Sequence, residues 1–91
     1  MIFYILKQAK GKLIIHTING HEIIKMSIRK LEKLLNKDFF RCHNSFIVNL
    51  EKINKIDVSD IYINNATIPI SKHRRKQLKA RLIEVLGDKL C

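Results

Sequence analysis

Several residue types that mark particular classes of protein are scarce in this sequence. Its 91 residues include no tryptophan, one proline, three glycines and two cysteines. No apolar run approaches the roughly 18 to 20 residues of a membrane-spanning helix, and residues 2–6 lack the basic start and cleavage site of a signal peptide. Cys42 and Cys91 are too few and too distant for a disulfide framework. We therefore expect a soluble, cytoplasmic chain with reduced thiols, in which residues 2–6 form a strand.

Acidic residues are also scarce. The sequence has 8 Asp and Glu against 18 Lys and Arg, which gives a formal net charge of +10. Such an excess attracts polyanions over long distances, so it predicts nucleic acid or an anionic membrane surface as a partner. The alternative is a lysine-rich surface without a partner, of the kind that AT-rich genomes encode.

The chemistry of an enzyme or a metal centre is poorly supported. The carboxylates are scattered without the pairing that acid–base catalysis needs, and three glycines leave no glycine-rich phosphate loop. The histidines and Cys42 form no CxxC or HxxxH pair, whereas a closed zinc site needs about four converging ligands. Cys42 and His43 are neighbours on an expected strand, so their side chains point to opposite faces. We expect no enzyme activity, metal or cofactor, and we expect Cys42 to be a buried small hydrophobe.

The apolar pattern predicts one small domain of many short strands. Strands are expected at 13–18, 21–26, 46–50, 53–58, 61–63 and 67–70. Asn19-Gly20 predicts a type I′ turn in the first hairpin, which sets Ile15 opposite Ile24. Both faces of this hairpin are largely apolar, so we expect both to be covered. Pro69 lacks an N–H and predicts an edge strand or a strand end.

Two segments have helical spacing. Ser27 is expected to cap a helix over 28–35, and Ser71 to cap a helix over 72–86 that Gly87 ends. The second helix should pack through a stripe of apolar residues, which are Leu78, Leu82, Val85 and Leu86. The predicted fold class is therefore mainly β with two helices (α+β), built of short antiparallel sheets.

Polar side chains that suit nucleic acid gather in two segments. The first, FFRCHNSFIVNL at 39–50, includes Arg41, His43, Asn44 and Ser45, and the second follows Pro69 with Lys72, His73, Arg74 and Arg75. Arginine and lysine bind phosphate and guanine, and asparagine can bind adenine through two hydrogen bonds. Structural alternatives remain: His43 as a buried histidine bonded to backbone, Ser45 as a strand-end cap, and Lys76 and Lys79 as the solvated side of a helix.

These segments resemble the LytTR family of bacterial DNA-binding domains. The family hallmark is F-x-R-x-H-x-S-y-x-V-N followed by P-x-S-r and basic residues, and here FFRCHNSFIVNL is followed by INKID and then by IPISKHRRKQL. The helix L-x-x-L-x-x-L-L and the hairpin with its Asn-Gly turn also fall where that family has them. The RCHNS core is similar in particular to AgrA-like response regulators of quorum-sensing two-component systems.

The resemblance implies a fold of short antiparallel sheets, not a helix-turn-helix, whose loops enter successive major grooves of promoter DNA at paired direct repeats. Asn44 falls on a base-contacting position, and His43 on a position that we assign to support of its loop. The remaining implied DNA-binding residues are Lys10 and Lys12 in the first loop, Arg41 and Ser45 beside Asn44, and Lys72, His73, Arg74 and Arg75 in the last loop.

Two positions depart from the AgrA-like pattern. Gly11 stands where that pattern has a base-reading histidine, and His73 stands where it has an arginine. A glycine has no side chain for a base edge, so sequence preference should depend on Asn44, on Arg74 and on DNA shape.

The expected domain comprises residues 1–91, lacks a receiver domain, and lacks the first strand or strands that LytTR domains typically have. It is either an excised domain or a naturally minimal transcription regulator, and a homodimer on DNA stays open. A basic RNA-binding module, or a protein that docks onto a full-length LytTR regulator and modulates it, are the alternative functions.

Overall fold

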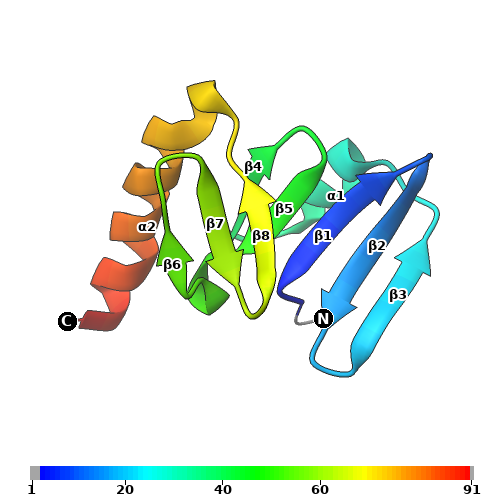
Figure 1. Cartoon of the computed structure of the whole chain (residues 1–91), viewed down its shortest axis with the longest axis horizontal. Coiled ribbons are helices and arrows are strands. Elements are labelled where there is room, and N and C mark those ends of the chain that lie inside the picture. Colours follow the sequence, from blue (N-terminus) through cyan, green and yellow to red (C-terminus); the bar gives the residue numbers. More distant parts are fainter. Residues whose placement is uncertain (1–2, 91) are drawn as a thin grey trace.

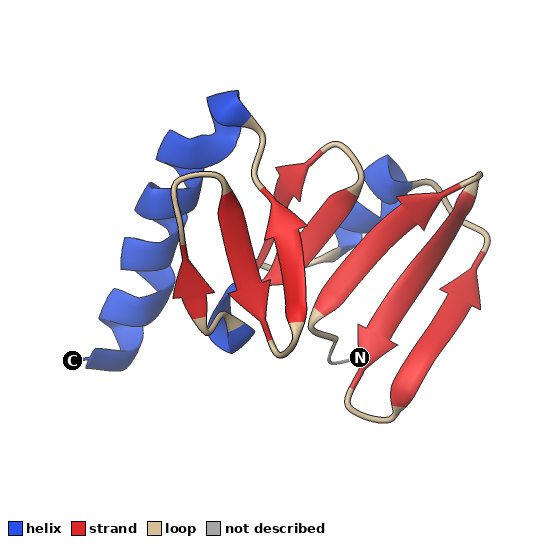
Figure 2. Cartoon of the chain, in the orientation of Figure 1, coloured by secondary structure: helices blue, strands red, loops and turns tan. Residues whose placement is uncertain are grey.

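The computed structural model, which describes residues 3–90, contains two antiparallel sheets and two α-helices (Figures 1 and 2). The five-stranded sheet has the order β3-β2-β1-β5-β4, and the three-stranded sheet has the order β6-β7-β8. The strands are β1 (Ile5–Ala9), β2 (Lys12–Thr17), β3 (Gly20–Ile24), β4 (Phe39–His43), β5 (Phe46–Asn49), β6 (Lys55–Ile56), β7 (Asp60–Ile63) and β8 (Ala66–Pro69). The helices are α1 (Ile28–Leu34) and α2 (Arg75–Leu90), and short 3-10 helices cover Leu50–Lys52 and Lys72–Arg74.

The predicted fold class is confirmed. The chain is mainly β with two helices, and because five strands separate α1 from α2, these helices are not a helix-turn-helix pair. Within residues 3–90, neither helix combines the length and the apolarity that crossing a membrane requires.

The central strands of the five-stranded sheet are covered on both faces. Leu6 of β1 and Ile47 of β5 are buried in a cluster with α1. Their neighbours on the same strands, Ile5 and Val48, are buried in a second cluster with the three-stranded sheet and α2. The alternation of side chains along a strand therefore divides the core into two layers, one on each side of the sheet.

The turn of the β2–β3 hairpin differs from the predicted one. Its two central residues are Ile18 and Asn19, with Thr17 paired to Gly20. Neither central residue has a positive φ, so the turn is not type I′. The Thr17 hydroxyl accepts a hydrogen bond from the Asn19 N–H and donates one to the Gly20 carbonyl. These side-chain hydrogen bonds stabilise a turn conformation other than type I′.

This turn also changes the register of the hairpin. Ile15 lies opposite Glu22 rather than Ile24, a shift of two residues that leaves each side chain on its predicted face. The expectation that both faces are covered is wrong, since Ile18 and Ile23 are 79% and 58% exposed. The second core cluster takes side chains from β1, β4 and β5 but none from β2 or β3.

The first helix agrees with the prediction better than the second. The Ser27 hydroxyl accepts a hydrogen bond from the Lys30 N–H at 3.1 Å and caps α1 as expected. Ser71 precedes the second helical segment without a side-chain cap, and α2 itself begins at Arg75. The predicted stop at Gly87 is wrong: its φ is not positive, so the helix continues through it. Leu86 lies outside the packed stripe and is exposed.

The strand pattern from residue 46 to residue 70 predicts a meander of four strands, but only β6, β7 and β8 form one, because β5 pairs with β1 and β4 in the other sheet. Pro69 ends the edge strand β8, where its missing N–H breaks no ladder. The first strand is displaced from the predicted residues 2–6 to Ile5–Ala9, and Ile2 lies outside the described residues.

The motif asparagine Asn49 ties the N-terminal segment to the sheet. Its side chain is 5% exposed, and its amide donates to the Phe3 carbonyl at 3.1 Å while its Oδ1 accepts from the Glu51 N–H at 3.0 Å. Phe3 is fully buried and stacks on Phe39 with ring centroids 4.6 Å apart. Asn49 therefore provides a hydrogen-bond partner to one backbone group in the N-terminal segment and to one in the 3-10 helix that follows β5.

Replacing Asn49 by leucine should lower the free energy of unfolding by about 1–3 kcal/mol, because it leaves the Phe3 carbonyl and the Glu51 N–H without these partners. Urea denaturation measures the change. The control Asn65→Ala, at an exposed turn asparagine, should stay within about 0.5 kcal/mol of the original chain. Equal stability of the two variants would contradict the role of Asn49.

Cys42 is a free thiol with no exposed surface, which confirms the expected small buried hydrophobe. Burial raises the pKa of the Cys42 thiol from the usual 9.0 to about 12, against smaller opposing effects from a backbone hydrogen bond and from Arg74. The thiol is neutral at physiological pH, so it is a poor nucleophile.

In a Cys91→Ser variant, Cys42 is the only thiol, and we expect iodoacetamide to label it in urea but not in the folded protein at pH 8. Because burial raises the pKa of the Cys42 thiol in the folded state, its contribution to the free energy of unfolding is complete below about pH 9. That contribution is lost as the pH rises toward 12. Mass spectrometry measures labelling. Rapid labelling under native conditions would contradict the buried placement.

Candidate nucleic-acid interface

Three polar segments lie along one edge of the molecule, the upper edge in Figure 1. They are the β1–β2 turn, the β4–β5 turn and the 3-10 helix before α2. The Gln8 N–H donates to the Ser45 carbonyl at 2.8 Å, and the Ser71 N–H donates to the Cys42 carbonyl at 2.8 Å. These backbone hydrogen bonds tie the first and last segments to the middle one.

The β1–β2 turn consists of Lys10 and Gly11, which have φ values of 48° and 74°. Both lie in the left-handed region, as a type I′ turn requires, and Lys12 opens β2 opposite Ala9. The residue pattern predicted a type I′ turn at Asn19-Gly20 and did not predict this one. A positive φ gives a backbone reason for glycine at position 11, and the flanking lysines are exposed.

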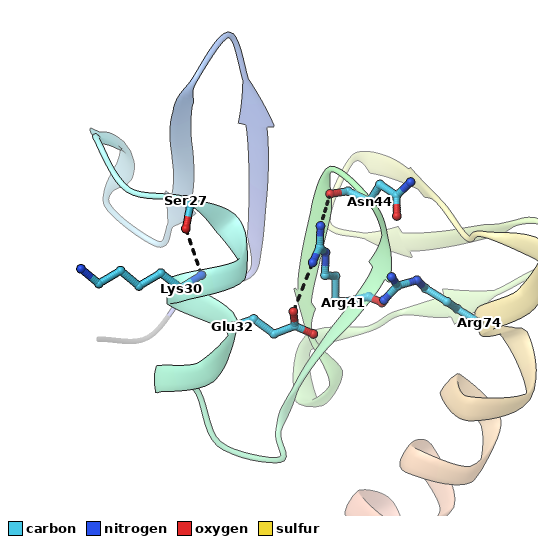
Figure 3. Close-up of polar contacts among 6 residues, drawn as sticks. All are labelled: Ser27, Lys30, Glu32, Arg41, Asn44 and Arg74. Atoms are coloured by element: carbon cyan, nitrogen blue, oxygen red, sulfur yellow. Dashed lines mark hydrogen bonds and ion pairs between the residues drawn. The ribbon is translucent and has the colours of Figure 1, made fainter.

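The β4–β5 turn presents Asn44 and Ser45. Asn44 is exposed, and within residues 3–87 its side-chain amide has no hydrogen-bond partner. His43 is half-buried, with Nδ1 accepting from the Ser45 N–H at 3.1 Å and its ring edge-on to Phe46 at 5.7 Å. In Figure 3 the Asn44 side chain extends from the turn on the side away from Glu32.

Arg41 lies beneath this turn, with its side chain 15% exposed. Its Nη2 donates to the Asn44 carbonyl at 2.8 Å, and its Nη1 forms an ion pair with the Glu32 carboxylate at 3.3 Å (Figure 3). Glu32 was not among the residues predicted from the sequence. The available signal was that Glu32 is the only acidic residue in α1.

The last segment divides into exposed and half-buried cations. Lys72 and His73 are exposed, whereas Arg74 and Arg75 are half-buried. Arg74 Nη1 donates to the Arg41 carbonyl at 2.9 Å, which connects this segment to β4. The structure therefore brings the three segments that hold the predicted DNA-binding residues to one edge, but Arg41 and Arg74 each make contacts within the domain. Arg75 lines a separate groove with Asp57 and Val58.

Metal-ligand clusters and surface grooves are the other features that could hold a ligand in the described part of the chain. No three His, Cys, Asp or Glu residues among those described gather as a metal site. An open groove of about 700 Å³ lies between α1 and α2, and its lining includes Glu32, Arg41 and Arg74. A second groove of about 550 Å³ separates the two sheets on the side of His16 and His21.

Comparisons with known proteins agree with this arrangement. Residues 1–83 match the family described as the LytTr DNA-binding domain. A solved structure, the LytTr DNA-binding domain of a putative methyl-accepting/DNA response regulator from Bacillus cereus, superposes with a TM-score of 0.80 at 28% identity. The match covers 88% of this chain and 80% of that one. The curated protein sequences contain no match.

The family match spans all three segments of the interface and both sheets that hold them. The chain belongs to the LytTR family of DNA-binding domains.

Proposed function

We propose that this domain binds double-stranded promoter DNA in a sequence-specific manner, as the DNA-binding part of a bacterial transcription regulator. The observation that carries the proposal is the alignment of three exposed polar segments along one edge, tied together by backbone hydrogen bonds. Loops fixed in this way can enter the grooves of a duplex as one rigid unit. A role within a response regulator, as described for the Bacillus cereus protein, fits the AgrA-like pattern of the middle segment.

Asn44 is the proposed base reader. Its amide presents both a donor and an acceptor at the tip of a turn, which suits the N6 and N7 edge of adenine in the major groove. Gly11 offers no side chain in the neighbouring segment, so base discrimination depends more heavily on Asn44.

The exposed cations on both sides of Asn44 are the proposed phosphate contacts. Lys10 and Lys12 lie on one flank, and Lys72 and His73 on the other. A lysine is a flexible point charge, so these side chains add affinity without reading sequence. This division separates specific recognition from general attraction within one edge.

Burial of the aromatic side chains favours DNA over RNA as the partner. None of the described phenylalanine and tyrosine residues is exposed, and Phe3 and Phe40 belong to the core. Single-stranded RNA is commonly bound by bases stacking on exposed aromatic rings.

Replacing Asn44 by alanine should weaken binding to a selected duplex by about 5- to 150-fold, with little change for a shuffled duplex, because the substitution removes only hydrogen bonds to a base. Fluorescence anisotropy on duplexes recovered from a random library measures both affinities. The matched control is Asn65→Ala, in the β7–β8 turn at the opposite edge (Figure 1). An equal decrease on both duplexes would remove Asn44 from base recognition.

Replacing Lys10 and Lys12 together by glutamine should weaken binding to every duplex alike. The slope of log K against log salt should become shallower by about 0.9 for each phosphate that the variant no longer neutralises. Anisotropy titrations at several salt concentrations give the slope. Lys52→Gln, in the 3-10 helix before β6, provides a single-lysine control away from this edge. An unchanged slope in the double variant would place the phosphate contacts elsewhere.

A further inference from the structure

The peptide unit between Asn44 and Ser45 is held at both of its polar atoms by side chains. Its carbonyl accepts from Arg41 Nη2 at 2.8 Å, and its N–H donates to His43 Nδ1 at 3.1 Å. Because a peptide unit is planar, fixing both groups fixes the plane itself. The backbone from which the Asn44 side chain projects therefore has little freedom to rotate.

The strand ladder alone does not provide this restraint. Pairing between β4 and β5 is irregular between Phe40 and His43 and resumes at the His43–Phe46 pair, which flanks the turn. The ladder therefore restrains the turn through this one pair, and the side chains of Arg41 and His43 add the contacts that hold the Asn44–Ser45 peptide unit.

Glu32 is one of the two groups that hold the Arg41 guanidinium. The Ser27 cap begins α1, and Glu32 follows in the same helix with its carboxylate against Arg41 Nη1 (Figure 3). A guanidinium holds two acceptors at once because its donors form a rigid fork, and here the acceptors are Glu32 and the Asn44 carbonyl. Arg41 Nε is buried without a partner in the described residues, so the two Nη contacts alone orient the group.

We propose that Glu32 and Arg41 are positioning residues that orient Asn44 for base recognition, an inference that rests on the proposed function. Glu32 acts in two ways. It keeps Arg41 directed at the Asn44 carbonyl rather than at DNA phosphate, and its negative charge reduces attraction to any duplex. Loss of Glu32 therefore weakens specific binding relative to non-specific binding while general affinity rises.

The first test compares Glu32→Gln with Glu22→Gln, which removes the same charge from the exposed surface of β3. Binding to the selected and shuffled duplexes is measured by anisotropy, and thermal unfolding verifies that each variant folds. Glu32→Gln should lower the ratio of the two affinities by about 2- to 5-fold, a modest effect because Glu32 is 43% exposed. Glu22→Gln should leave the ratio unchanged. Equal ratios for the two variants would overturn the inference.

A double variant distinguishes positioning from general stabilisation. If Glu32 acts through Asn44, then Glu32→Gln should not lower the ratio further in an Asn44→Ala background. An additional decrease there would overturn the inference and leave the proposed function intact. If Asn44→Ala alone leaves the ratio unchanged, Asn44 is not the base reader, and the inference fails together with that assignment.

Arg41→Lys provides an independent measurement at the other residue. A lysine keeps the charge but cannot hold Glu32 and the Asn44 carbonyl together in a fork, so the ratio should fall by about 10-fold. An unchanged ratio in this variant would show that the charge of Arg41 matters rather than its geometry, which would overturn the inference.

Discussion

The interface depends on which face of the sheet each side chain of β4 occupies. Phe40 and Cys42 point into the core beneath the three-stranded sheet, while Arg41 lies on the other face and reaches Glu32 and the turn that follows. An irregularity between Phe40 and His43 breaks the alternation and places His43 beside its pairing partner Phe46, next to the same turn. Core packing therefore fixes the strand, and the strand fixes the two side chains that hold the Asn44–Ser45 peptide unit. Arg74 adds a third connection, because its guanidinium donates to the Arg41 carbonyl. In the segment 39–50, Arg41 and His43 therefore stabilise the turn, and Asn44 is left exposed at its tip.

The cations of this edge separate according to the chemistry of their side chains. Two of the arginines donate to backbone carbonyls, whereas the lysines are exposed. The planar guanidinium orients a partner through directed donors, and the ammonium attracts phosphate as a point charge without fixed geometry. A net charge of +10 thus overstates the number of groups that are available to DNA, since part of the basic composition holds the fold together.

Local patterns in the sequence predicted the elements better than their junctions. The Ser27 cap and the edge position of Pro69 depend on short-range chemistry, and both were confirmed. The predicted four-stranded meander lost its first strand to the other sheet, because strand pairing depends on long-range contacts. The hairpin turn was wrong because Asn19-Gly20 competes with the Thr17 hydroxyl, and sequence alone does not decide that competition. Gly87 permits a helix end without requiring one. Residue chemistry pointed to two of the three segments as suited to nucleic acid, whereas the first segment and the role of each residue came from the resemblance.

Glu32 shows what a charge-based interpretation of such a surface omits. Attraction to DNA of any sequence rises with each added cation, but discrimination depends on the difference between specific and non-specific affinity. The charge of an acidic residue beside the interface reduces the affinity for every duplex alike. Only its second effect, the orientation of a base-reading turn, raises the specific affinity relative to the non-specific one. A carboxylate placed to hold an arginine is therefore consistent with selection for specificity in a domain whose composition otherwise favours indiscriminate binding.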